Sequence, residues 1–154
     1  MLSSLGAGPG RSTRPLDLVV TLAFVSGSAL VLWSAAVHLD LWQSGYRSIP
    51  TIGALFLLQS IAGIVLGLLI LAARRVWAAV LGVGFALATM AGFLVSVAHG
   101  LFGFEDSWDA PFAQQAFALD IAAAATLLFA GALCLATSAP ASTSRATPAG
   151  NTSP

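Results

Sequence analysis

Four polar side chains stand inside or beside long apolar runs, where they can do chemistry that the rest of the chain cannot. His38 and His99 each close an apolar run, and Gln59 and Asp120 each lie about eight residues inside another. Two histidines and a carboxylate from separate helices can supply three ligands to zinc, copper or iron. Two histidines on facing helices can also hold a haem. The sequence therefore offers a candidate metal-, haem- or quinone-binding site. Its residues are His38, His99, Asp120 and Gln59, with Arg47 at its mouth.

The apolar setting also allows a simpler role for each of these residues. An acid in hydrocarbon costs several kcal/mol unless it is paired or neutral, so Asp120 and Gln59 can instead hydrogen-bond across a helix bundle. His38 and His99 can be interfacial residues whose rings reach water and headgroups. The histidines are too far apart for a compact metal signature such as His-x-x-x-His, so both interpretations stay open.

Composition indicates the solvent in which these groups act. Of 154 residues, 58% are hydrophobic and 8% are charged, whereas a soluble domain carries about 25% charged residues. A chain this poor in charge needs lipid around it. Six acidic and six basic side chains cancel, so the net charge indicates no nucleic-acid partner. The single cysteine, Cys134, excludes an internal disulfide and any Cys-x-x-Cys chemistry.

Four long apolar stretches divide the chain, over about 16–39, 51–73, 76–98 and 112–137. Each has the roughly 20 residues that an α-helix needs to cross a bilayer. The sequence thus predicts an all-α, four-transmembrane-helix bundle over 16–137, with a flexible tail at 1–15 and a disordered tail at 138–154. The first stretch can also be interpreted as a signal peptide, although it is longer than the usual apolar core of one.

The arginines predict the orientation of the bundle. In a four-span arrangement Arg47 lies alone on one side, and the other five lie opposite: Arg11, Arg14, Arg74, Arg75 and Arg145. The positive-inside rule makes the side with five arginines cytoplasmic. Both termini are therefore expected in the cytoplasm, and the membrane is expected to be a bacterial plasma membrane.

The two halves of the chain align without a gap when one is shifted by 61 residues. Four pairs then coincide: His38 with His99, Ser48 with Asp109, Pro50 with Pro111, and Gln59 with Asp120. The second pair is predicted to cap two helices whose first turns hold the prolines. The alignment predicts two parallel two-helix repeats related by an axis along the membrane normal.

A Gly63-x-x-x-Gly67 motif lies in the second apolar stretch. Such spacing lets two helices approach closely. It predicts tight packing and leaves homo-oligomerisation or a membrane-protein partner open.

The region from His38 to Gln59 contains the segments HLDLW, GYRSIPTIG and LFLLQ. Through them the chain resembles small uncharacterised four-span membrane proteins of high-GC Gram-positive bacteria, over roughly a seventh of its length. The resemblance implies a bacterial plasma-membrane protein and assigns no catalytic residue. The layout is also similar to DoxX-type four-helix proteins, in architecture alone.

Three functions are compatible with these features. The first is a structural or accessory bundle for a membrane complex, which needs only the helices and their small-residue faces. The second is the metal-, haem- or quinone-binding redox protein described above. The third is a small transporter or proton pathway, with Asp17, Gln59 and Asp120 as polar steps. No residue pattern names a reaction, so the sequence favours a non-enzymatic accessory bundle.

Overall fold

The protein folds as four long helices, seen in a computed structural model that describes residues 15–138. They are α1 (Pro15–Ser44), α2 (Ile52–Ala73), α3 (Val76–His99) and α4 (Ala113–Ser138), with a short 3-10 helix, η1 (Tyr46–Ser48), after α1. All four are long and apolar enough to cross a membrane. The prediction of an all-α four-helix bundle is confirmed, and the chain is a multi-pass integral membrane protein.

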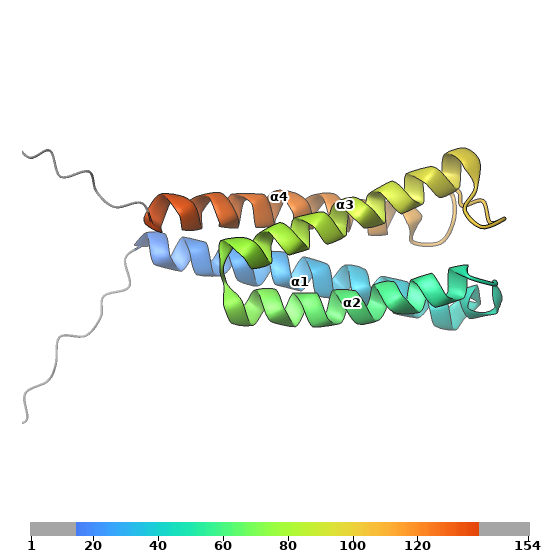
Figure 1. The fold of residues 1–154 in the computed structure, drawn as a ribbon, viewed down its shortest axis with the longest axis horizontal. Coiled ribbons are helices and arrows are strands. Elements are labelled where there is room, and N and C mark those ends of the chain that lie inside the picture. The colour runs from blue at the N-terminus through green and yellow to red at the C-terminus, as the bar shows by residue number, and fades with distance from the viewer. Residues whose placement is uncertain (1–14, 139–154) are drawn as a thin grey trace, which may run out of the picture.

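The helices alternate in direction, which gives the bundle two distinct ends (Figure 1). At one end, here called the arginine end, lie the start of α1, the end of α4 and the Arg74–Arg75 turn. The opposite end, the loop end, holds the connections between α1 and α2 and between α3 and α4. Apart from Pro15 and Ser138, which belong to helices, the two predicted tails lie outside the described residues.

α1 packs closely against both α2 and α4, and α3 packs mainly against α4. The α1–α2 contact depends on small residues. A Cβ atom at Gly63 would lie 2.8 Å from the Cβ atom of Ala35, and one at Gly67 would lie 2.7 Å from the side chain of Leu32. The Ser28 hydroxyl also donates a 2.7 Å hydrogen bond to the Gly67 carbonyl. The close approach predicted from the GxxxG motif is therefore confirmed, and its partner is α1 of the same chain.

The 61-residue repeat appears in the positions at which the helices begin. Ile52 and Ala113, the first residues of α2 and α4, are 61 positions apart. The residues that follow the two prolines also adopt the same unusual backbone, with φ of 63° at Thr51 and 62° at Phe112. The two halves of the chain thus share one register.

The predicted helix caps are wrong, because α2 and α4 begin after the prolines rather than before them. The Ser48 hydroxyl donates to the Gly45 carbonyl within the η1 turn, at 2.8 Å. Asp109 lies in a loop turn, where its backbone N–H donates to the Ser107 hydroxyl at 3.2 Å. A residue with positive φ cannot continue into a right-handed helix. The chain therefore turns at Thr51 and Phe112, and the helices begin at the next residue.

We expect Gly63→Ala to destabilise the bundle by roughly 1–3 kcal/mol, because the Cβ atom of Ala35 cannot rotate away and the two helices must separate. The matched control is Gly84→Ala on α3, where a new Cβ atom meets nothing within 4 Å. Thermal unfolding in a mild detergent measures both variants. Equal midpoints for the two would contradict the packing described here.

Candidate ligand cavity

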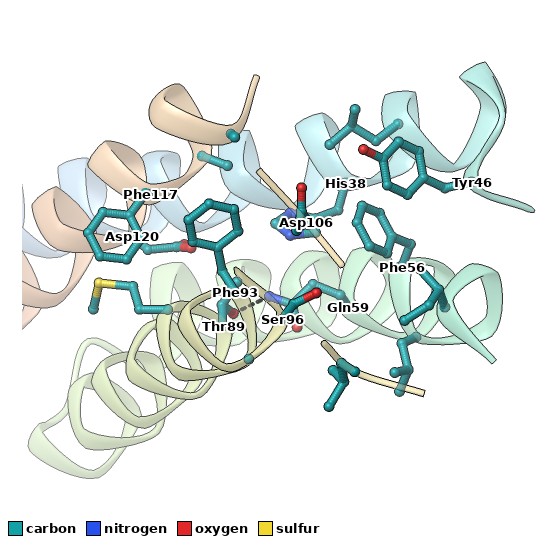
Figure 2. Close-up of a pocket in the computed structure, with 18 of the residues that line it drawn as sticks. His38, Tyr46, Phe56, Gln59, Thr89, Phe93, Ser96, Asp106, Phe117 and Asp120 are labelled. Atoms are coloured by element: carbon teal, nitrogen blue, oxygen red, sulfur yellow. Dashed lines mark hydrogen bonds between the residues drawn. The ribbon is translucent and has the colours of Figure 1, made fainter. Parts of the chain in front are cut away.

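A cavity of about 350 Å³ lies in the loop-end half of the bundle (Figure 2). Its walls come from all four long helices, from η1 and from the loop between α3 and α4. Cavities of roughly 300–1,000 Å³ with mostly apolar walls are the usual small-molecule sites of proteins. The size and the mixed origin of the walls make it the candidate functional site.

The cavity exists because α2 and α3 diverge. The two helices are close at the Arg74–Arg75 turn and separate toward the loop end (Figure 1). The ring of Phe85 on α3 lies against Gly63 of α2 and fills the space nearer the turn. Beyond that ring three of the lining residues are small, namely Ala62, Ala88 and Gly92.

The exposed residues of α2 and α3 that line the cavity are all apolar. Leu58 of α2 is 61% exposed, and Leu55 and Ala88 are exposed as well. Exposed apolar side chains on a spanning helix contact lipid tails. A lipid-soluble molecule can therefore reach the cavity between α2 and α3 without crossing water.

His38 lies inside α1 and lines the cavity, with 9% of its surface exposed. Its Nδ1 atom is 2.8 Å from the carbonyl oxygen of Ser34. A carbonyl oxygen only accepts hydrogen bonds, so Nδ1 carries the hydrogen and donates it. In a neutral imidazole this leaves a lone pair on Nε2, which is the ring nitrogen available to the cavity.

Asp120 lies seven positions after the first residue of α4, or about 10 Å into the helix. The residue as a whole is 2% exposed, and it lines the cavity. Its Oδ1 atom accepts a 2.8 Å hydrogen bond from the Ser34 hydroxyl of α1. Ser34 therefore contacts both polar groups, His38 through its carbonyl and Asp120 through its hydroxyl.

Gln59 occupies the corresponding position of α2, also seven residues into its helix. Its side-chain amide nitrogen donates a hydrogen bond to the Thr89 hydroxyl of α3, as the dashed line in Figure 2 shows. Thr89 in turn donates to the carbonyl of Phe85, at 3.0 Å. Because the hydroxyl hydrogen of Thr89 is used in this way, Thr89 accepts from the amide, and the Gln59 oxygen is left available to the cavity.

Aromatic rings line two sides of the cavity. On one side Phe56 stacks on Tyr46, with 4.6 Å between ring centroids, and lies 5.4 Å from the His38 ring. On the other side Phe93 and Phe117 lie 5.8 Å apart. Trp108 of the loop packs edge-on against both of them, at 4.7 Å and 5.1 Å.

The loop between α3 and α4 folds back over the cavity. Phe102 and Gly103 have φ of 52° and 80°, which makes a two-residue turn closed by two hydrogen bonds between Leu101 and Phe104. The Ser96 hydroxyl donates to the Phe104 carbonyl at 3.3 Å and ties this turn to α3. The turn thereby brings Phe104 to the cavity wall, edge-on to Tyr46.

Asp106, from the same loop, brings a second carboxyl group to the cavity. Burial raises the pKa of Asp106 above its ordinary value, while the Ser107 backbone N–H and the nearby His38 ring act in the opposite direction. Burial, and secondarily the charge of Asp106, raises the pKa of the Tyr46 hydroxyl. Asp106 is therefore a partly desolvated acid beside the cavity.

The structure brings three of the five predicted site residues together and leaves two apart. His38, Gln59 and Asp120 line the cavity, whereas His99 and Arg47 are exposed and do not. The 61-residue alignment pairs the two histidines, but their helices end differently. α1 contains no glycine or proline between His38 and Gly45 and so continues past the histidine, but Gly100, with φ of 73°, ends α3 directly after His99.

Within residues 15–138, no group of three or more His, Cys, Asp or Glu side chains lies close enough together to hold a metal ion. His38 and Asp120 are both at the cavity, and Ser34 stands between them. The predicted pair of His38 and His99 would require α3 to reposition its last residue.

Several residues of the cavity were not identified from the sequence. Thr89, Phe93 and Phe117 belong to apolar stretches in which no spacing distinguishes them from core residues. Tyr46 and Asp106 belong to the loops, where solvated side chains are the ordinary expectation. Only the 61-residue alignment gives a signal, since Phe56 and Phe117 coincide in it and both line the cavity.

We expect the hydrogen bond between Ser34 and Asp120 to contribute about 1 kcal/mol to the stability of the bundle, the usual size of such bonds between membrane helices. A double-mutant cycle of Ser34→Ala and Asp120→Ala, followed by thermal unfolding in detergent, measures the coupling. Ser26→Ala, at an exposed position of α1, is the control that should show no coupling to Asp120→Ala. Additive effects of the first pair would contradict the contact.

Asp106 should make folding sensitive to pH. Because its pKa is higher in the folded protein than in the unfolded chain, the folded state binds more protons in the range just above the ordinary value of 3.8. The free energy of unfolding should therefore fall as the pH rises through that range. Asp106→Asn should remove this part of the dependence, and Asp109→Asn, exposed in the same loop, should retain it. Parallel unfolding curves for the wild type and Asp106→Asn at every pH would rule the effect out.

No family model, curated protein or solved structure matches this chain.

Proposed function

We propose that this membrane protein binds a small lipid-soluble molecule in the cavity between α2 and α3. The observation that carries the proposal is the cavity itself: about 350 Å³ in volume, opening on lipid-facing residues and lined by aromatic rings around a few polar groups. Binding sites for small molecules combine apolar walls with a few well-placed polar atoms in this way. The ligand would reach the site through the gap between the two helices.

The polar groups support a ligand with one polar end. His38, Gln59 and Asp120 each hold one atom in a hydrogen bond to the protein and offer another to the cavity. They come from three different helices, and Asp106 adds a fourth group from the loop. A ligand whose polar end meets these groups would leave its apolar body among the rings of Phe56, Phe93 and Phe117.

The proposed location is the outer leaflet of a bacterial plasma membrane, with both termini in the cytoplasm. Arg74 and Arg75 lie at the arginine end, and Arg47 lies at the loop end. Together with the sequence positions of the remaining arginines, this distribution supports a cytoplasmic arginine end. The cavity would then open toward the outer half of the bilayer.

The other functions considered from the sequence stay predictions. A redox role would now have to use His38 without His99, because only the first of the two lines the cavity. An accessory role in a membrane complex and a transport role are both compatible with a protein that binds a small molecule. Ligand binding is therefore the property to measure first.

Fluorescence of Trp108 offers a direct test, since its ring contacts two residues of the cavity wall. A variant in which the other three tryptophans are replaced by phenylalanine would be placed in nanodiscs and titrated with dansyl amide, a neutral probe that accepts energy from tryptophan. We expect a saturable transfer. Ala116→Phe, which fills the cavity wall, should weaken binding about tenfold or more, equivalent to ~1.4 kcal/mol.

The matched control is Ala118→Phe, two residues along the same helix, exposed and outside the cavity. It adds the same ring to the protein and should leave the titration unchanged. Transfer that rises without saturation, and equally in all three proteins, would mean that the probe only partitions into lipid. That result would overturn the proposed function.

A further inference from the structure

The charged groups at the cavity are unbalanced. Asp106 and Asp120 line it, and of the described residues that share this lining none is Lys or Arg. His38 is the one lining side chain able to carry a positive charge, and with two ionised carboxylates the wall is negative even then. A carboxylate in a medium of low dielectric constant is stabilised only by a nearby opposite charge or by several hydrogen bonds.

Most of the hydrogen-bonding atoms that the described lining residues leave free are acceptors, and the donors among them are the Tyr46 hydroxyl and one N–H of Gln59. Nδ1 of His38 already donates to Ser34, which leaves the Nε2 lone pair. The amide nitrogen of Gln59 donates one of its two hydrogens to Thr89, which leaves the amide oxygen as an acceptor and one N–H as a donor. An anionic ligand such as a carboxylate or phosphate would find few donors here, whereas a group that carries N–H hydrogens would find several acceptors.

The aromatic residues add a third feature of the same kind. Phe56 and Tyr46 lie on one side of the cavity, and Phe93 and Phe117 on the other. The face of an aromatic ring carries negative electrostatic potential and attracts cations within about 6 Å, most strongly where water is excluded. Rings and carboxylates together favour a positive charge at the centre of the cavity.

From these three features, and resting on the proposed function, we infer that the ligand is a hydrophobic cation, a protonated amine or a quaternary ammonium compound with an apolar body. Its charged end would lie between Asp106 and Asp120, among the aromatic rings. Its body would extend toward the lipid-facing gap lined by Leu58 and Ala88. The charge of the ligand, and not only its apolar surface, would then select what the cavity binds.

Three competitors with one common body separate charge from hydrophobicity: 4-phenylbutylamine, 4-phenylbutanol and 4-phenylbutyrate. Each would displace dansyl amide from the protein at pH 7, in nanodiscs of zwitterionic lipid so that the membrane itself has no net charge. We expect the amine to compete at a concentration roughly tenfold lower than the alcohol, a ratio equivalent to about 1.4 kcal/mol. The acid should be the weakest competitor.

Asp120→Asn and Asp106→Asn should each reduce the advantage of the amine and leave the alcohol unchanged, and their continued binding of dansyl amide would show that they are folded. Asp109→Asn, exposed and outside the cavity, should behave as the wild type. An alcohol that competes as well as the amine, or an advantage that survives in both cavity variants, would overturn the inference while the proposed function stands. Failure of dansyl amide itself to bind would overturn both.

Discussion

Polar side chains inside a bilayer must find their partners within the protein, and this requirement determines how the two halves of the bundle meet. Asp120 of α4 binds the Ser34 hydroxyl of α1, and Gln59 of α2 binds the Thr89 hydroxyl of α3. Gln59 and Asp120 occupy the same position of the 61-residue repeat. Both bonds run between the halves rather than within one. The same physical constraint therefore acts at both interfaces between the repeats.

The α1–α4 and α2–α3 interfaces nevertheless differ, because only the second contains the cavity. α1 and α4 pack closely along their length, with Gly27 against the Leu127 side chain. Between α2 and α3 the Phe85 ring lies against Gly63, and the Gln59–Thr89 bond bridges the two helices farther from their turn. Beyond Phe85 three of the residues at this gap are small, namely Ala62, Ala88 and Gly92. The two halves therefore pack closely at one interface and leave a cavity at the other.

Hydropathy alone predicts the four helices, because a spanning helix is a property of one uninterrupted apolar stretch. Some of their ends are less predictable, since they depend on the backbone: Gly100 ends α3 directly after His99, while α1 continues past His38 to Ser44. That last difference leaves His38 inside a helix and His99 at the end of one. Hydropathy also does not predict that Thr89 is the hydrogen-bond partner of Gln59. The rotation of α3 about its own axis decides which of its residues faces α2, and hydropathy does not specify that rotation.

The hydrogen bonding of the Asp120 carboxyl group bears on why an acid is present inside a membrane-spanning helix. Among the described residues no fully buried side-chain oxygen or nitrogen lacks a partner, yet Ser34 supplies a bond to only one oxygen of the carboxyl group. The other oxygen is not sealed in the protein and is available to the cavity. A helix contact alone would be met by an asparagine, at a lower desolvation cost than a carboxylate. One oxygen of the Asp120 carboxyl group has a hydrogen-bond partner in the protein, and the other is available to the cavity. This arrangement fits a site in which a bound ligand supplies the second partner.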